Sequence, residues 1–386
     1  MSDAHGPLAG VKVVELQGVG PGPFGGMLLA DYGADVVRID RPGGSSAGRD
    51  PVSDVLARGR RSVAVDLKRP EGVEVVLRIV EGADALIEPF RPGVAERLGL
   101  GPDTCLERNP RLVYCRMTGW GQDGPYREKA GHDINYISLN GILHMIGTKG
   151  GPPVPPLNLV GDFGGGGMLL ALGLVCGIVH ARATGEGQVV DVAMQDGSAL
   201  LTAMIHQMRA FGGWAPERGT NVLDGGAPYY GVYETSDGGY MSVGPIEPQF
   251  YKELVEGLGL VDDPVVQGAR DDRERWPALH DRFAEVFRSR TRDEWAAVFA
   301  GKDACATPVL SLDEAMHEPQ VAERGTYVEE FGVVQPAPAP RFSATPAAIT
   351  TPAPAAGKHS RAVLADFGFD DMEIASLLGS GAVLDG

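Results

Sequence analysis

Two short stretches of this 386-residue chain carry residue types suited to proton transfer. His132 follows Gly131 and precedes a helical pattern, whereas Asp162 follows Gly161 and precedes a run of four glycines. One imidazole and one carboxylate at the openings of two helices can act as opposed acid and base around a single carbon atom. The pair therefore suggests chemistry that moves a proton from one face of a carbon to the other.

Each of these residues has a simpler interpretation when it is taken alone. A single histidine near a helix start is more often a capping or packing residue. A lone aspartate there is more often a helix cap, stabilised by the helix dipole. Glu247, between Pro245 and Pro248, is a third candidate acid, whose simpler role is that of a solvated residue ahead of a helix. His132 and Asp162 together favour catalysis over these simpler roles.

The elements that must position these groups begin with an alternation of strand and helix signals over the first 120 residues. Strands are expected at 11–16, 34–39, 62–67, 85–87, 112–117 and 188–194, and helices at 24–32 and from Pro70 onward. Strand–helix–strand units in sequence predict a parallel sheet with helices on its faces. The predicted fold class is therefore α/β, with a Rossmann-like parallel sheet in a large domain.

The character of the sequence changes after residue 195. A helix of mixed polarity is expected first, and then a hairpin, three helices, a Pro- and Ala-rich connector and a last short helix, at 198–211, 229–243, 248–258, 276–288, 292–299, 334–356 and 370–378. The predicted domains are a large α/β domain at 1–195, a linker helix and connection at 196–224, a smaller α+β domain at 225–325, and a return connector with the C-terminal part of the large domain at 326–386.

Charge, cysteine and hydropathy patterns exclude several classes of protein. The net charge of −17 argues against nucleic-acid and anionic-membrane partners. The four cysteines show no metal-ligand spacing, so we expect neither a metal site nor a disulfide framework. The apolar run 164–178 is shorter than the roughly 20 residues of a membrane span, and we expect a buried core helix there. Without a recognisable targeting segment, the expected location is the cytoplasm.

A glycine pattern near the N-terminus offers a competing interpretation. The segment Gly20-Pro21-Gly22-Pro23-Phe24-Gly25 fits the dinucleotide-binding pattern, and Asp40 lies where a ribose-binding acid would be expected. However, the two prolines remove backbone N–H donors from the loop that would hold a pyrophosphate. Arg38 and Arg41 also bracket Asp40, which suits a phosphate better than a hydroxyl. A nicotinamide-dependent oxidoreductase is therefore only an outside alternative.

Three arginines, Arg41, Arg91 and Arg97, lie at or just after the ends of predicted parallel strands. Open α/β sheets bind their ligands at that edge. A single arginine is usually ordinary surface charge. In a chain of net charge −17, however, the placement of three of them together indicates a phosphate-bearing ligand. Asp66 and Lys68 fall in the same region, at the end of the third strand.

Motifs in a specific order cover nearly the whole chain, at 16–42, Val65-Asp66-Leu67-Lys68, Phe90-Arg91-Pro92-Gly93, Met117-Thr118-Gly119-Trp120-Gly121, Cys305-Ala306-Thr307-Pro308-Val309 and 363–378. Together they resemble the superfamily of family III CoA-transferases and α-methylacyl-CoA racemases, the CaiB/BaiF type. The segments 131–136 and 161–163 resemble its racemase branch. Transferases of the family carry a flexible glycine tetrad in the small domain, whereas 243–248 is stiff here, which favours a racemase.

The resemblance implies roles for individual residues. It implies that His132 and Asp162 are the two acid/base groups, and that Asn158 and Tyr230 lie near the reacting centre. It also implies that Glu247 orients or charges His132 of the partner subunit in an interlocked homodimer. The CoA contacts that it implies come from Arg41, Val65, Asp66, Leu67, Lys68, Pro89, Phe90, Arg91, Arg97, Gly131, His132, Asp133, Ile134, Asn135 and Tyr136.

The activity expected from the resemblance is epimerisation of 2-methyl-branched acyl-CoA thioesters, through an enolate and without a cofactor, since CoA is part of the substrate. The enolate oxygen needs hydrogen-bond donors, which backbone N–H groups at the helix openings after His132 and Asp162 would supply. One alternative is a family III CoA transferase with Asp162 as its nucleophile. Another is a non-catalytic acyl-CoA-binding protein, which would not need His132, Asp162 and Glu247 together.

Overall fold

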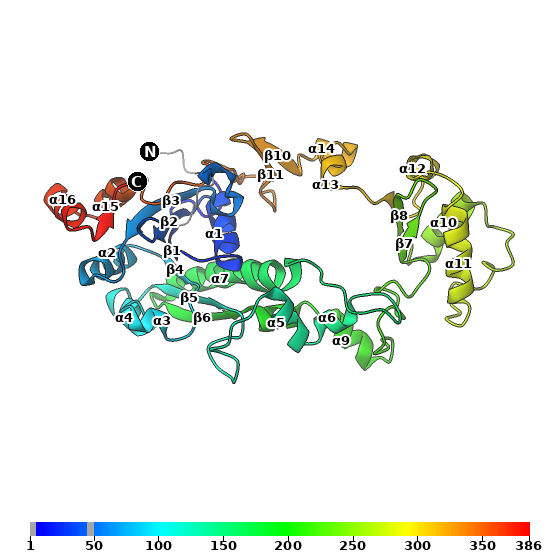
Figure 1. Cartoon of the computed structure of the whole chain (residues 1–386), viewed down its shortest axis with the longest axis horizontal. Helices are drawn as coiled ribbons and strands as arrows, with labels where there is room; N and C mark the ends of the chain where they lie inside the picture. Colours follow the sequence, from blue (N-terminus) through cyan, green and yellow to red (C-terminus); the bar gives the residue numbers. More distant parts are fainter. Residues whose placement is uncertain (1–4, 45–49) are drawn as a thin grey trace. The chain divides into compact units, whose positions relative to one another are not determined.

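The computed structural model describes residues 5–44 and 50–386, which divide into two compact units (Figure 1). The first unit comprises the chain up to residue 140 together with 157–201 and 322–386. The second unit comprises 141–156 and 202–321. The short segment 141–156 thus belongs to the second unit, whereas the boundaries expected from the sequence put it in the large domain.

A seven-stranded sheet forms the centre of the first unit, in the order β12-β3-β2-β1-β4-β5-β6. All neighbours are parallel except the edge pair of β12 and β3. The strands are β1 (Lys12–Leu16), β2 (Asp35–Asp40), β3 (Arg60–Val65), β4 (Ala85–Glu88), β5 (Val113–Thr118), β6 (Gln188–Ala193) and β12 (Val383–Leu384). This is the order of a doubly wound Rossmann sheet, which reverses between β1 and β4. The predicted α/β fold class is confirmed.

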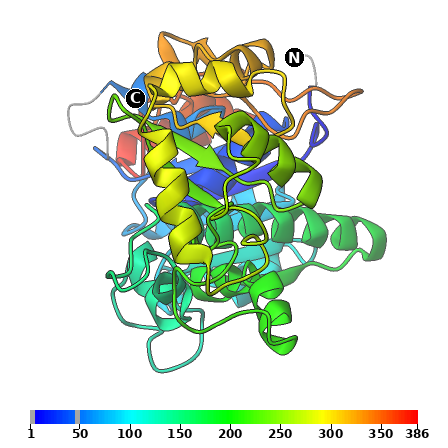
Figure 2. The ribbon, with the colours of Figure 1, turned by 90° about the vertical axis from the view of Figure 1, so that its right-hand side faces the viewer.

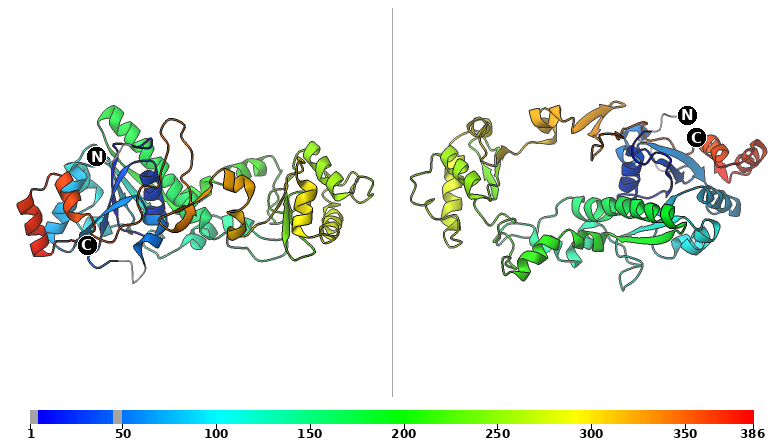
Figure 3. Two further views of the ribbon diagram at one scale, coloured as in Figure 1. Left: turned by 90° about the horizontal axis from the view of Figure 1, so that it is seen from above. Right: turned by 180° about the vertical axis from the view of Figure 1, so that it is seen from behind.

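Helices cover both faces of this sheet (Figures 1 and 3), so its strands are nearly continuous apolar runs. Successive residues of one strand point to opposite faces, and Val13 and Val14 accordingly lie in two different cores. One core is completed by α2 (Pro70–Glu81), α4 (Pro102–Arg108), α15 (Ser360–Asp366) and α16 (Asp371–Ser380). The other core is completed by α1 (Pro21–Asp31), α5 (Asp133–Leu139) and α7 (Met168–Thr184).

The apolar run around 164–178 forms a longer helix than the sequence predicts. A π-helix, η3 (Leu159–Gly167), continues directly into α7, and the 26-residue segment is long and apolar enough to cross a membrane. It packs on α1, β5 and β6 within the first unit, but Leu172 and Val179 are 57% and 64% exposed. The predicted core helix is present, with Leu170, Leu174 and Ile178 in the core, but it is longer than predicted and is only partly buried.

The second unit contains a small antiparallel sheet of β7 (Gly231–Glu234), β8 (Tyr240–Val243) and β9 (Ala306–Pro308). The helices α10 (Pro248–Leu258), α11 (Trp276–Phe287) and α12 (Arg292–Phe299) complete its core (Figure 2). The predicted hairpin and these three helices are confirmed. The predicted helix at 198–211 is instead two helices, α8 (Met194–Leu200) and α9 (Ala203–Ala210), because a turn at Leu201 and Thr202 interrupts it.

The remaining elements are short. The connector predicted at 334–356 begins as a strand, since β11 (Val333–Pro336) pairs with β10 (Tyr327–Glu330). The tail also contains α15 and β12, which the sequence did not predict as separate elements. The other short helices are α3 (Val94–Arg97), α6 (Ile142–Met145), α13 (Leu312–Ala315) and α14 (Pro319–Glu323), with 3-10 turns at Pro51–Ser53 and Val55–Ala57.

Candidate active site

A cavity of about 450 Å³ lies in the first unit, beyond the carboxyl ends of β1, β4, β5 and β6. Doubly wound sheets bind ligands at this edge, where the strand order reverses. His132 and Asp162 both line the cavity. The other lining residues are Val19, Gly20, Pro21, Pro89, Phe90, Arg91, Pro92, Met117, Thr118, Gly119, Trp120, Arg127, Lys129, Ala130, Gly131, Tyr136 and Met194.

His132 is exposed and is the N-cap residue of α5. Its backbone N–H donates to the side-chain oxygen of Asn135, at 3.1 Å, which closes the first turn of the helix. Tyr136 packs edge to face on Trp120, with ring centroids 4.7 Å apart, and its hydroxyl donates to the Gly131 carbonyl at 2.5 Å. These contacts anchor the turn that presents the imidazole to the cavity.

Asp162 lies in the π-helical segment η3, where the Phe163 N–H donates to the Asn158 carbonyl five residues earlier, at 3.3 Å. Such segments are rare and are frequently found at functional sites. Burial raises the pKa of Asp162 above its ordinary value, against the effect of a 3.3 Å hydrogen bond from the Asn158 amide. A carboxyl group with a raised pKa is better suited to giving and taking a proton near neutral pH.

Asp133 connects the two turns. Its side chain is buried, and its Oδ2 accepts the backbone N–H groups of Gly161 and Asp162, each at 2.7 Å. A Cβ on Gly161 would lie 2.7 Å from the same oxygen, so this contact requires glycine. The resemblance implies a CoA contact from Asp133, but its carboxylate is engaged with the Asp162 turn.

The loop after β1, set aside in the sequence as a doubtful dinucleotide motif, forms part of this cavity. Gly20 caps α1 with φ 69°, and a Cβ built on it would lie 3.6 Å from Oδ2 of Asp162. Met117 to Trp120 and Met194 also line the cavity and were not predicted as site residues, although their positions at strand ends were a usable signal. Arg127 and Lys129 lie in a loop and carried no such signal.

The residues expected to contact CoA fall into two groups. Pro89, Phe90, Arg91, Gly131 and Tyr136 line the cavity with His132 and Asp162. The remaining members in the first unit lie outside its lining, namely Arg41, Val65, Asp66, Leu67, Lys68, Arg97, Asp133, Ile134 and Asn135. Asn158, expected near the reacting centre, also lies outside the lining. Among these, the Val65 side chain is 1% exposed in the core, whereas Lys68 is exposed just beyond the end of β3.

Arg41, Arg91 and Arg97 are exposed, and each lies on the carboxyl-edge side of a strand. Within residues 5–44 and 50–386, none of the three guanidinium groups has a carboxylate partner. By contrast, the guanidinium of Arg60 is buried and paired with Glu15 at 3.0 Å. The three exposed cations are thus available to an external anion.

Glu247 and Tyr230 belong to the second unit. Glu247 is the exposed N-cap residue of α10, and its carbonyl accepts the Tyr251 N–H at 3.0 Å. Tyr230 lines a separate cavity of about 490 Å³ with Gly244 and Cys305. Neither residue lines the cavity that holds His132 and Asp162.

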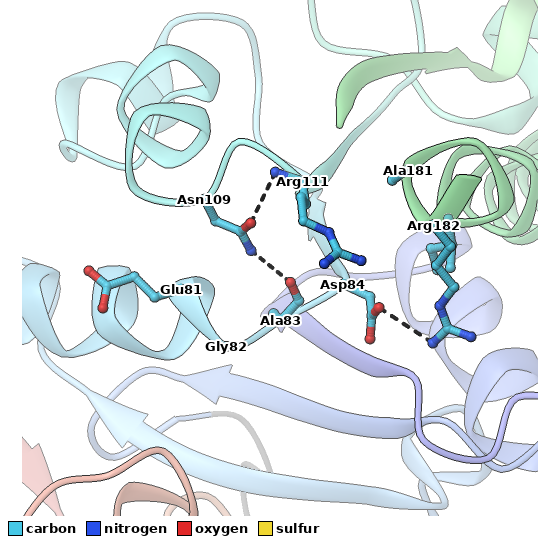
Figure 4. Close-up of a pocket in the computed structure, with 9 residues that line it drawn as sticks. Glu81, Gly82, Ala83, Asp84, Asn109, Arg111, Ala181 and Arg182 are labelled. Atoms are coloured by element: carbon cyan, nitrogen blue, oxygen red, sulfur yellow. Dashed lines mark hydrogen bonds and ion pairs between the residues drawn. The ribbon is translucent and has the colours of Figure 1, made fainter. Parts of the chain in front are cut away.

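A further cavity, of about 230 Å³, lies at the opposite, amino edge of the large sheet (Figure 4). Its polar groups bond one another: Asp84 pairs with Arg182 at 3.4 Å, and the Asn109 amide donates to the Ala83 carbonyl at 2.8 Å. Among the described residues, no group of three potential metal-ligating side chains is close enough to hold an ion. The carboxyl-edge cavity is therefore the candidate active site.

The chain can be compared with known proteins now that its doubly wound sheet and carboxyl-edge cavity are described. Residues 8–360 match the sequence profile of CoA-transferase family III, and the chain belongs to this family. It is 46% identical over 374 residues to alpha-methylacyl-CoA racemase of Mus musculus and 46% identical over 373 residues to that of Homo sapiens, covering 96% of this chain and 96% of each relative.

A solved structure supports the same assignment. The crystal structure of a CAIB/BAIF family protein from Brucella suis matches with a TM-score of 0.80 and 27% sequence identity. The match covers 94% of this chain and 100% of that chain. The family and the fold expected from the sequence motifs are thereby confirmed.

Proposed function

We propose that this protein is an isomerase that epimerises 2-methyl-branched acyl-CoA thioesters at the α-carbon. The observation that carries the proposal is that His132 and Asp162, from two separate turns, line one cavity. An imidazole and a carboxyl group in one cavity suit a two-base proton transfer. The 46% identity to two alpha-methylacyl-CoA racemases, over almost the whole length of each, supports the same reaction.

In this mechanism His132 removes the α-proton from one configuration while protonated Asp162 delivers a proton to the opposite face. The reverse direction exchanges the two roles. The enolate oxygen needs donors already in place where its charge develops. The N–H groups of Gly161 and Asp162 are engaged by Asp133, so we assign this role to the first N–H groups of α5, on Asp133 and Ile134.

Arg41, Arg91 and Arg97 are proposed to bind the phosphate groups of CoA, because they are exposed at the carboxyl edge and free of carboxylate partners within the described chain. No cofactor is invoked, since the thioester itself makes the α-proton more acidic. The remaining CoA contacts, the absence of a cofactor and the cytoplasmic location stay predictions.

We also propose that the protein acts as a homodimer in which Glu247 supports His132 of the partner subunit. In the single chain α7 exposes Leu172 and Val179, and α9 has no buried side chain at all. Isolated short helices are marginal in water, and large exposed apolar faces of soluble proteins usually mark interfaces. A second copy of the chain is the partner that family resemblance favours.

The decisive experiment incubates one stereoisomer of a 2-methylacyl-CoA with the protein in heavy water, without a carboxylic acid acceptor. A two-base racemase loses configuration and incorporates deuterium at the α-carbon. His132→Ala or Asp162→Ala should each slow the loss of configuration by at least about 10²-fold. If no deuterium enters, and CoA instead passes to an added acid in a reaction that needs Asp162, the protein is a CoA transferase.

A further inference from the structure

We infer that Asp133 is a positioning residue that fixes Asp162 relative to His132 and sets its charge environment, an inference that rests on the proposed function. Asp133 directly follows His132, so the two share one turn of backbone. Its Oδ2 accepts the N–H groups of Gly161 and Asp162, each at 2.7 Å, on a segment 28 or more residues away. A single carboxylate oxygen therefore ties together the two turns that carry the acid/base pair.

The geometry alone does not require a carboxylate at this position. Both hydrogen bonds end on Oδ2, and an asparagine carbonyl oxygen in its place would accept the same two N–H groups. The other oxygen, Oδ1, is buried and has no hydrogen-bond partner among the described residues. A buried charged group with an unpartnered oxygen is costly. What a carboxylate adds to the two bonds, which an asparagine would also make, is its negative charge beside Asp162.

The effect of this charge follows from the groups around Asp162. Burial is the largest cause of the raised pKa of Asp162; the Asn158 hydrogen bond and the His132 charge lower that pKa, and the Asp133 charge raises it. Tyr136, on the same helix as Asp133, stays neutral because burial raises its pKa to about 12. The charged and titratable groups around this region are His132, Asp133 and Tyr136 from the α5 turn and Arg91 from the loop after β4. Arg127 and Lys129, from the loop before His132, line the same cavity.

A higher pKa makes ionised Asp162 a stronger base for the α-proton. It also keeps Asp162 protonated to a higher pH. Removing only the Asp133 charge should thus lower the pKa of Asp162 and leave the turn in place. Removing the whole side-chain acceptor should free the turn as well. Asp133→Asn and Asp133→Ala separate these two contributions.

The first measurement is the wild-type rate of configuration loss in heavy water, because an inactive wild type would refute the proposed function independently of Asp133. We expect Asp133→Asn to fold. In its plot of kcat/KM against pH, the acid limb should lie at lower pH than in wild type, by about 0.5 pH unit or more. The limb moves down because a base of lower pKa remains ionised to lower pH. An Asn variant that does not fold, or whose acid limb is unchanged, would overturn the role of the charge.

In Asp133→Ala we expect at least about a tenfold loss of racemisation. The isomer whose proton His132 removes should then exchange deuterium with retention more often than it inverts, because Asp162 no longer meets the opposite face correctly. A merely structural residue would lower activity without changing this ratio of exchange to inversion, and that result would overturn the positioning role.

Asp84→Asn is the matched control. Asp84 also accepts a backbone N–H, from Lys12 at 2.9 Å, but it lies at the amino edge of the sheet (Figure 4). Its substitution should change neither the acid limb nor the ratio of exchange to inversion. An equal change in this control would show that both readouts respond to general loosening of the sheet, and the inference would fail.

Discussion

The ring of Phe163 stacks on the ring of Phe24, with centroids 4.6 Å apart and planes inclined by 28°. Phe163 directly follows Asp162 in η3, and Phe24 lies in the first turns of α1. The two helices approach closely at Gly167, where an added Cβ would lie 2.6 Å from the Phe24 ring. The stack therefore holds the turn of Asp162 against the first helix of the sheet.

Phe163→Leu should keep most of the apolar volume and lose the aromatic contact, which is worth about 1 kcal/mol of unfolding free energy. Because the neighbouring Asp162 would move, kcat should fall at least several-fold while KM changes less. Chemical denaturation and steady-state kinetics measure the two effects. Phe342→Leu is the control, since Phe342 packs on Tyr32 with centroids 5.6 Å apart and away from the cavity. Equal kcat values for the two variants would contradict this prediction.

The buried carboxyl group of Glu88 should make the free energy of unfolding depend on pH. It is buried at the end of β4, where burial raises its pKa to about 7, although the Phe90 N–H and Arg116 favour the charged form. The pKa of Glu88 is higher in the folded protein than in the unfolded chain, so protonated Glu88 increases the free energy of unfolding. This contribution is fully present below the unfolded pKa near 4.5 and is lost as the pH rises through about 7. The full effect is on the order of 3 kcal/mol.

Glu88→Gln should therefore flatten the dependence of unfolding free energy on pH. Denaturant titrations at about pH 6 and about pH 8.5 should show wild type losing more stability than the variant over this interval. Parallel losses in both proteins would mean that Glu88 titrates close to its ordinary value.

The arginines at the carboxyl edge provide a binding prediction. Arg91→Ala or Arg97→Ala should raise KM at least several-fold, because a charge-assisted phosphate contact is worth roughly 1.5–3 kcal/mol, while kcat at saturation should change little. Added salt should reduce the difference in KM between variant and wild type, because salt screens the contact between arginine and phosphate. Arg108→Ala is the control, since that guanidinium is paired with Glu74 and Glu81. An unchanged KM at low salt would remove the substituted arginine from the site.

If each site of the proposed homodimer uses residues of both subunits, two different inactive variants should restore activity to one another. His132→Ala and Glu247→Ala proteins, each inactive alone, should recover part of the activity when they are unfolded together and refolded as a mixture. The recovered fraction should depend on mixing before refolding, because only then do hybrid dimers form. Sedimentation of a fully active monomer would contradict the interface and the contribution of Glu247 from the partner.

Local patterns predicted much of the fold. The strands around Val13, Val36 and Leu86 are short, strongly apolar runs, and Pro70 and Pro248 each begin a helix as their fixed φ favours. Segments whose conformation depends on distant partners were predicted less well. The glycine run 164–167 continues a π-helix because its backbone packs closely on α1 and α8, and nothing within the run indicates that packing.

The sequence by itself determined the parallel α/β organisation, the family and the candidate pair His132 and Asp162, because these depend on residue type and on spacing along the chain. Only the tertiary structure decided that both residues line one cavity and that Asp133 faces the Asp162 turn. Both depend on hydrogen bonds and packing between segments far apart in sequence. No local pattern specifies such contacts, because they form only when the β-sheet brings its carboxyl-edge loops together.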